Sequence, residues 1–236
     1  MGQATIATRG HLLSTPPSGP RSGHLIRRLF QLYVGLVLYG ASVALLVESD
    51  LGLAPWSVLD QGLAERTELT IGVVSIIVGA AVLLLWIPMR QRPGLGTVSN
   101  VFVVGIAMDA TLALVPEAHT LGVRIPLLLA GVLLNGVATG LYIAARFGPG
   151  PRDGLMTGLH RRTGRSIRLV RTAIELAVVA TGFVLGGTVG VGTALYAVAI
   201  GPLAQLFLRV FAVPSSSSGS STVVATGQPE QAILRG

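Results

Sequence analysis

Residues 27–49 read RRLFQLYVGLVLYGASVALLVES, an apolar run that follows a pair of arginines. A helix needs about 20 apolar residues to cross the hydrocarbon core of a bilayer, and this run is long enough. Comparable runs follow near 70–89, 97–116, 123–145, 167–187 and 191–212. We therefore expect an all-α polytopic membrane protein with about six transmembrane helices.

The composition agrees with a membrane location. Of the 236 residues, 51% are hydrophobic and 11% are charged, whereas ordinary soluble domains carry roughly 25% charged residues. The net charge of +7 does not indicate nucleic-acid binding, because the arginines gather at the ends of the apolar runs. The chain has no cysteine, which excludes disulfides and cysteine-ligated metal.

The arginines also predict the orientation of the spans, because basic residues near span ends favour the cytoplasmic side. If six spans alternate, one side receives Arg27, Arg28, Arg90, Arg92, Arg146, Arg152, Arg161, Arg162, Arg165, Arg168 and Arg209. The other side receives Arg66 and Arg124 with Glu48, Asp50, Asp60, Glu65, Glu68 and Glu117. We expect a bacterial inner-membrane protein with both termini in the cytoplasm.

The two ends of the chain lack apolar periodicity. Residues 1–24 are rich in Pro, Ser, Thr and Gly, and residues 214–236 begin with Pro214 and a Ser/Gly run. We expect both to be disordered cytoplasmic tails around a transmembrane domain over 25–213. The first tail has no apolar core of the kind that a signal peptide needs.

An internal repeat runs through the apolar region at a fixed offset of 96 residues (131 − 35 = 96), without gaps from 35–105 to 131–201. The informative matches are glycines and prolines, which report backbone geometry. We expect repeat one over 27–116 and repeat two over 123–212, with three spans in each. Two units of three spans must insert in opposite directions, as in inverted-repeat transporters. The alternative is that the duplication only builds a stable bundle.

Each repeat carries a short segment broken by glycine and proline after its first span. These segments are LGLAPWSVLDQGL at 51–63 and FGPGPRDGLMTGL at 147–159. Pro55 and Pro151 suit the first turn of a helix, and the helices that follow are too short to span. We expect two re-entrant or interfacial helices. The alternatives are an interfacial helix anchored by Trp56, and a tight cytoplasmic turn with an Arg152–Asp153 surface pair.

Three strings resemble a known family: GLAPWSVLD at 52–60, GPGPRDGLM at 148–156 and RLVRTAIE at 168–175. They are similar to the YczE group of bacterial integral membrane proteins, which is related to the YitT/YyaS proteins. The resemblance covers about 27–212. It implies a multi-pass membrane protein and assigns no biochemical activity.

Polar and ionisable residues inside membrane spans are costly and mark functional sites. Arg171 and Glu175 lie four residues apart on one helix face and can pair, while Asp109 and its repeat equivalent Gln205 share one depth. Asn135 is expected to pack between helices. The candidate substrate-binding or coupling residues are Pro55, Trp56, Ser57, Asp60, Asp109, Asn135, Pro151, Arg152, Asp153, Arg171, Glu175 and Gln205.

Two interpretations of the charged group around Arg171 stay open. It can be an internal salt bridge that holds the fifth span to the basic loop. It can also be an anion- or proton-linked site made by Arg152, Asp153, Arg171 and Glu175, with the helix that begins at Pro151 adding partial positive charge.

No motif indicates catalysis. The sequence lacks His-Glu-x-x-His, Gly-x-Ser-x-Gly and the phosphate-binding Gly-x-x-x-x-Gly-Lys. We expect that the protein is not an enzyme and that it has no cofactor and no metal site. The favoured function is a transporter-like protein that moves a small solute or ion. The alternative is a non-transporting accessory, scaffold or regulatory subunit. The expected partners are the lipid bilayer, the solute and further copies in a homo-oligomer, and not nucleic acid.

Overall fold

The computed structural model describes residues 21–211. These residues form eight α-helices and no strand. The helices are α1 (Arg21–Ser49), α2 (Pro55–Thr67), α3 (Ile71–Trp86), α4 (Leu95–Leu112), α5 (Leu121–Ala144), α6 (Pro151–Thr163), α7 (Ile167–Leu185) and α8 (Val191–Phe211). The predicted tail 1–24 overlaps the start of α1, and the rest of it and the tail 214–236 lie outside the described residues.

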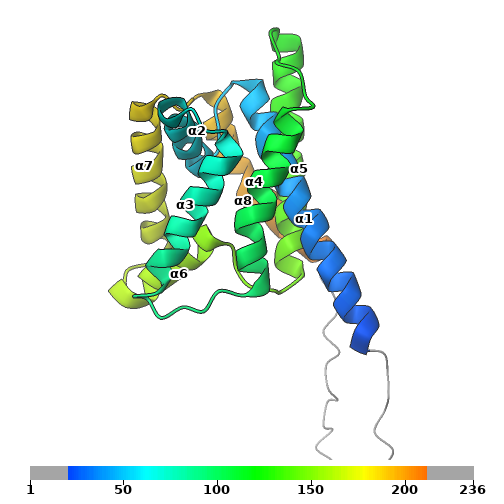
Figure 1. Cartoon of the computed structure of the whole chain (residues 1–236), viewed down its shortest axis with the longest axis vertical. Coiled ribbons are helices and arrows are strands. Elements are labelled where there is room, and N and C mark those ends of the chain that lie inside the picture. The colour runs from blue at the N-terminus through cyan, green and yellow to red at the C-terminus, as the bar shows by residue number, and fades with distance from the viewer. Residues whose placement is uncertain (1–20, 212–236) are drawn as a thin grey trace, which may run out of the picture.

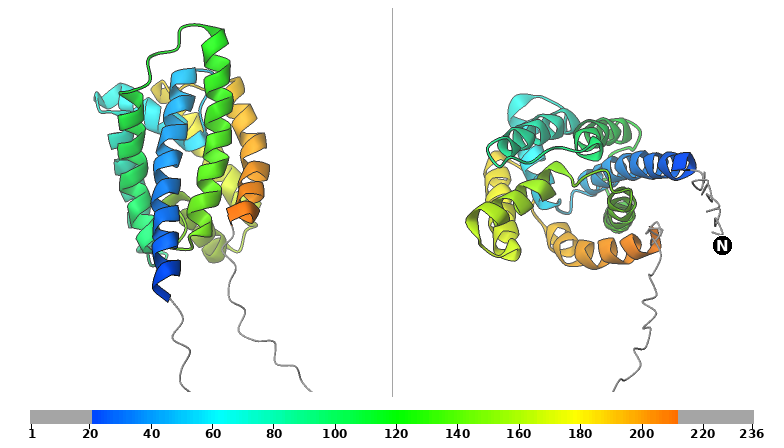
Figure 2. Two further views of the ribbon diagram at one scale, coloured as in Figure 1. Left: turned by 90° about the vertical axis from the view of Figure 1, so that its right-hand side faces the viewer. Right: turned by 90° about the horizontal axis from the view of Figure 1, so that it is seen from below.

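The helices form one bundle in which α1, α3, α4, α5, α7 and α8 run along the molecule (Figure 1). The short helices α2 and α6 lie toward opposite ends of it. Helix α1 begins and helix α8 ends toward the end of the bundle that holds α6 (Figure 2). The two long helices α1 and α5 pack on each other, and α4 and α8 flank them.

Four helices are long and apolar enough to cross a membrane, namely α4, α5, α8 and the part of α1 from Leu25 to Ser49. The pair α2–α3 is bent by 115° and gives a fifth candidate if it is one span. The prediction of an all-helical fold with several apolar spans is confirmed. By length and composition fewer than six helices are candidate spans, because α3 has only 16 residues and α7 carries three charged residues.

The short helices begin where the sequence predicts. Pro55 and Pro151 occupy the first turn of α2 and α6, where the missing N–H costs nothing. Before them the chain turns sharply at Gly52 (φ 118°) and Gly148 (φ 117°). This backbone region strongly favours glycine, so the paired glycines set the entry of each short helix.

The helix starts recur at the offset of the sequence repeat. Pro55, Ile71 and Leu95 begin α2, α3 and α4, and the residues 96 positions later begin α6, α7 and α8. We call two residues 96 positions apart counterparts. The repeat seen in the residues is therefore also present in the order of the helices and in the first residues of these three pairs.

Contacts between the two halves are reciprocal. The N–H of Gly96 donates to the carbonyl of Phe147 at 2.9 Å, and the N–H of Gly192 donates to the carbonyl of Leu51 at 2.8 Å. Each residue of the second bond is the counterpart of one in the first. Reciprocal pairs of this kind are the signature of contacts about a twofold axis.

Two arginines repeat this reciprocity at opposite ends of the bundle. Arg28 Nε donates to the carbonyl of Ala145 at 3.0 Å, and Arg124 Nε donates to that of Ser49 at 2.7 Å. Arg28 and Arg124 are counterparts, as are the two acceptors. Each guanidinium satisfies a free carbonyl at the C-terminal end of a long helix, which otherwise lacks a partner.

The halves differ in how their third long helices pack. A Cβ at Gly105 of α4 would lie 2.6 Å from the carbonyl oxygen of Gly72, so α3 lies directly on α4. The counterpart of Gly105 is Gly201 of α8, and a Cβ there would have no heavy atom within 4 Å. Instead α7 packs on α2, where a Cβ at Gly182 would lie 2.5 Å from the backbone of Val58.

Candidate functional site

An interior cavity of about 120 Å³ lies where all eight helices contribute lining residues. A cavity of about this volume can hold a molecule the size of benzene. The N-terminal turns of α2 and α6 reach it from opposite halves, through Pro55 and Pro151 and their neighbours. The two broken segments therefore meet at one site in the interior.

Counterpart residues from both repeats line this cavity. The pairs are Ala54 and Gly150, Pro55 and Pro151, Trp56 and Arg152, Ser57 and Asp153, Ser75 and Arg171, Gly79 and Glu175, and Asn100 and Tyr196. The cavity thus lies where the two repeats meet. All four charged lining residues belong to repeat two, and their counterparts in repeat one are uncharged.

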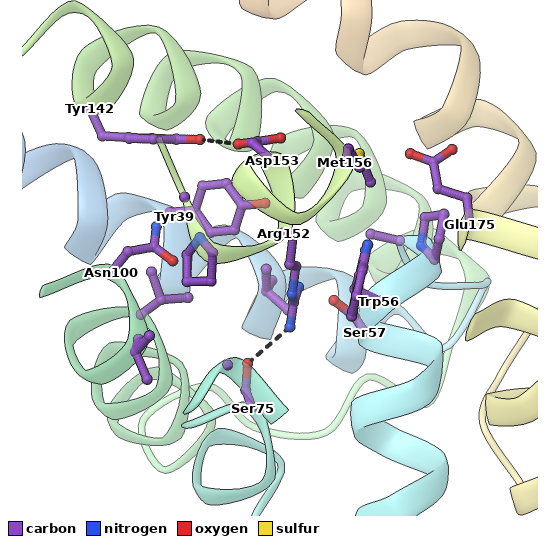
Figure 3. Close-up of a pocket in the computed structure, with 18 of the residues that line it drawn as sticks. Tyr39, Trp56, Ser57, Ser75, Asn100, Tyr142, Arg152, Asp153, Met156 and Glu175 are labelled. Atoms are coloured by element: carbon purple, nitrogen blue, oxygen red, sulfur yellow. Dashed lines mark hydrogen bonds between the residues drawn. The ribbon is translucent and has the colours of Figure 1, made fainter. Parts of the chain in front are cut away.

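Arg152 connects the two short helices. Its Nη2 donates to Asp60 Oδ2 at 2.7 Å and to Ser75 Oγ at 3.3 Å. The guanidinium also lies 5.0 Å from the centroid of the Trp56 ring, a cation–π distance. Asp60 is 1% exposed, so a largely buried ion pair holds α6 against α2. Figure 3 shows Arg152 reaching across the cavity toward Ser75.

Asp153 differs from Asp60 in that its carboxyl group has a tyrosine and not an arginine as its partner. Its Oδ2 accepts a hydrogen bond from the Tyr142 hydroxyl at 3.0 Å (Figure 3), and within the described residues no basic side chain pairs with it. It stands in the first turn of α6, where the helix dipole favours a negative charge. Its carboxyl group therefore lines the cavity without an ion-pair partner in the described residues.

Arg171 and Glu175 form the ion pair that their spacing predicts, with Arg171 Nε 2.8 Å from Glu175 Oε1. Both residues line the cavity from α7. Their side chains are 56% and 28% exposed, so the pair is at the margin of the cavity and contributes little stability.

Two buried polar atoms near the cavity have no hydrogen-bond partner within the described part of the chain: Trp56 Nε1 and Asp60 Oδ1. Buried polar groups are nearly always satisfied, and exceptions cluster at functional sites. Of the two residues only Trp56 lines the cavity, so its indole N–H is the donor that a bound solute can engage.

Four of the predicted site residues do not line the cavity. Asp60 lies behind it as the buried partner of Arg152, and the other three lie elsewhere. Asp109 accepts from Gly72 N at 2.8 Å and from Thr70 Oγ1 at 2.6 Å, so it caps the start of α3 outside the cavity. Its counterpart Gln205 is exposed on α8. Asn135 is buried, donates to Ser42 Oγ at 2.7 Å and accepts from the Tyr196 hydroxyl, which is an interhelical packing role.

Two of the alternative interpretations do not match the observed contacts. Trp56 is 9% exposed and lies against Arg152 in the interior, so it is not an anchor at the membrane surface. Arg152 pairs with Asp60 and not with its neighbour Asp153. Successive residues at the start of a helix point in different directions, whereas Asp60 lies on the facing helix.

The sequence reasoning missed the tyrosines. Tyr39, Tyr142 and Tyr196 line the cavity from α1, α5 and α8, with Ser75 and Asn100 beside them. Tyrosine is common at span ends, so the residue type alone does not distinguish a tyrosine of the cavity from one at the membrane surface. The repeat offers a signal: Tyr39 is the counterpart of Asn135, and Asn100 is the counterpart of Tyr196. Polar residues at both positions of each pair indicate an interior polar site.

Comparison with known proteins places the chain among bacterial membrane proteins. It is 41% identical to an uncharacterized Haemophilus influenzae protein over 181 residues, which is 77% of this chain and 83% of the relative. It is 32% identical to the uncharacterized membrane protein YczE of Bacillus subtilis, over 81% of this chain and 88% of the relative.

A third relative, the uncharacterized protein YyaS of Bacillus subtilis, is 25% identical over 75% of this chain and 90% of its own length. No solved structure matches the chain significantly. The resemblance to the YczE group is thereby confirmed, and a membrane location with it. Residues 26–209 match the family of unknown function DUF6198, and the chain belongs to this family.

Proposed function

We propose that this protein moves a small solute or ion across the bacterial inner membrane, with the central cavity as its binding site. One observation carries the proposal: a single cavity is lined by counterpart residues of two repeats and by the N-terminal turns of two broken helices. Transporters built from inverted repeats place their sites at this kind of interface, near the bilayer midplane.

The proposal includes a membrane layout of six spans as two inverted units, with both termini in the cytoplasm. The long helices α1, α3, α4, α5, α7 and α8 would be the spans, and α2 and α6 would enter from opposite faces. Its support is the segregation of arginines, the reciprocal contacts between the halves, and the start of α1 and the end of α8 at one end of the bundle.

Alternating access would use the unequal packing of the two repeats. In this structure α3 lies on α4, whereas α7 lies on α2. Since the repeats share their helix pattern, the second arrangement would bring α7 onto α8 and release α3. Inverted repeats exchange conformations in this way when access to a fixed central site alternates.

The competing function is a non-transporting accessory or regulatory subunit. One observation favours it: the cavity arginines are both in ion pairs, with Asp60 and with Glu175. Paired charges of this kind can serve packing alone. We assign no catalytic role to either candidate.

Flux into liposomes that contain the purified full chain tests the proposal. A panel of small amines, carboxylates and monovalent ions is offered with and without a proton gradient. We expect at least one of them to enter faster than into empty liposomes. Asp153→Asn and Glu175→Gln should each lower that rate at least about tenfold. Glu65→Gln, an exposed residue outside the cavity, is the matched control and should not.

A silent panel with folded protein, together with recovery of a stoichiometric membrane partner, would favour the accessory function. Equal losses in the control and the cavity variants would also contradict the proposed site, because the effect would then follow from charge removal in general.

A further inference from the structure

A second, open pocket of about 740 Å³ lies at the end of the molecule that holds α6. Its walls are the segment between α3 and α4 and the second half of α6. Four arginines line it, namely Arg90, Arg92, Arg161 and Arg162, and no acidic residue does. None of them takes part in an ion pair within residues 21–211.

The pocket is built by specific packing. Arg162 Nη1 donates to the carbonyl of Pro88 at 3.1 Å, which ties α6 to the segment after α3. A Cβ at Gly158 would lie 2.1 Å from Gln91 Nε2, so the two walls touch at a glycine. The four arginines border one concavity, and their like charges favour an anionic ligand there.

The repeat does not require this arrangement. The counterparts of Arg90, Arg92 and Arg161 are Gly186, Thr188 and Glu65, and only Arg162 has a basic counterpart, Arg66. The equivalent place at the other end of the bundle therefore has one arginine and not four. Exposed apolar side chains also border this pocket, unlike an anion site that faces only water. At the end of α3, Leu84 and Leu85 are 65% and 52% exposed, and Ile87 directly after it is 71% exposed; these side chains would face lipid chains.

We propose that this pocket binds the phosphate-bearing headgroup of an anionic membrane lipid, with its acyl chains against the exposed leucines of α3. Arginine provides several donors that match phosphate oxygens, and basic pockets between membrane helices bind such headgroups. The site is separate from the central cavity and does not depend on transport.

The simpler explanation is that these arginines only orient the protein in the membrane. Both explanations predict loss of stability when many arginines are removed, so a matched control is needed. Arg165 and Arg168 lie on the same side, are exposed and do not line the pocket. Arg165→Gln with Arg168→Gln therefore removes the same charge from the same end of the protein.

The experiment follows the melting temperature of the purified full chain in detergent during titration with lipid. Phosphatidylglycerol should stabilise the protein saturably, whereas phosphatidylcholine and inorganic phosphate should not. Arg90→Gln/Arg92→Gln and Arg161→Gln/Arg162→Gln should each weaken the apparent affinity about thirtyfold. The control pair should change it less than about threefold. The lipid-free melting temperature of each variant reports whether it folds.

Three results would overturn the proposal. Equal weakening in the control pair would show a general charge effect. Full stabilisation by inorganic phosphate alone would assign the pocket to a soluble anion. Equal stabilisation by phosphatidylcholine would remove the need for a net negative headgroup.

Discussion

Asp60 and Arg152 form an ion pair whose carboxylate side chain is 2% exposed, while Arg152 keeps 24% of its side chain open to the cavity. A pair of this kind stabilises little when intact, but removing one partner leaves a charge in a poorly solvated place. We expect Asp60→Asn to destabilise the protein by about 2–3 kcal/mol. This is less than the roughly 3–5 kcal/mol typical of breaking a fully buried pair, because Arg152 is partly solvated. Thermal unfolding in detergent measures the change.

The chain supplies the control for this variant. Arg124 and Asp50 also pair, but the Asp50 side chain is 61% exposed, so Asp50→Asn should cost less than about 1 kcal/mol. Asp60→Asn combined with Arg152→Gln should recover part of the loss, because neither charge is then left alone. Equal effects of Asp60→Asn and Asp50→Asn would show that the Arg152 pair is as well solvated as the surface one.

Individual residues also show how much of the candidate site could be predicted from the sequence alone. Eight of the residues that line the cavity were predicted as site residues, namely Pro55, Trp56, Ser57, Pro151, Arg152, Asp153, Arg171 and Glu175. Their signal was the pair of broken segments and charge within an apolar run. The partner of Arg152 could not be predicted, because Asp60 is 92 residues away and spacing along one helix says nothing about the facing helix.

Among the helices, α4 and α8 are counterparts that pack differently. A Cβ at Gly105 of α4 would lie 2.6 Å from a backbone carbonyl, whereas one at Gly201 of α8 meets nothing within 4 Å. We expect Gly105→Ala to destabilise the protein by about 1–3 kcal/mol, since backbone must move to admit the methyl group. Gly201→Ala should be neutral or slightly stabilising, because alanine favours helix. Thermal unfolding of both variants makes the comparison.

The same pair tests the proposed movement of α7. If α7 closes on α8 during transport, Gly201→Leu should leave the melting temperature unchanged but lower flux, because its side chain would block the approach. Unchanged flux with Gly201→Leu would rule out closure at this position. The sequence repeat could predict that the last three helices of each half begin at equivalent residues. It could not predict unequal packing, which depends on residues such as Trp86 where repeat two has Gly182.

The orientation of the whole molecule is open to a direct test, because the natural chain has no cysteine. Position 60 is unsuitable for labelling, since Asp60 is 1% exposed and paired with Arg152. Glu65 on α2 and Arg165 after α6 are both exposed and stand toward opposite ends of the bundle. If the repeats are inverted with both termini inside, a membrane-impermeant maleimide should label Glu65→Cys in intact cells. Arg165→Cys should react only after the membrane is permeabilised. Labelling of Arg165→Cys from outside would contradict the inverted layout and would also place the arginine pocket on the wrong leaflet for the positive-inside rule.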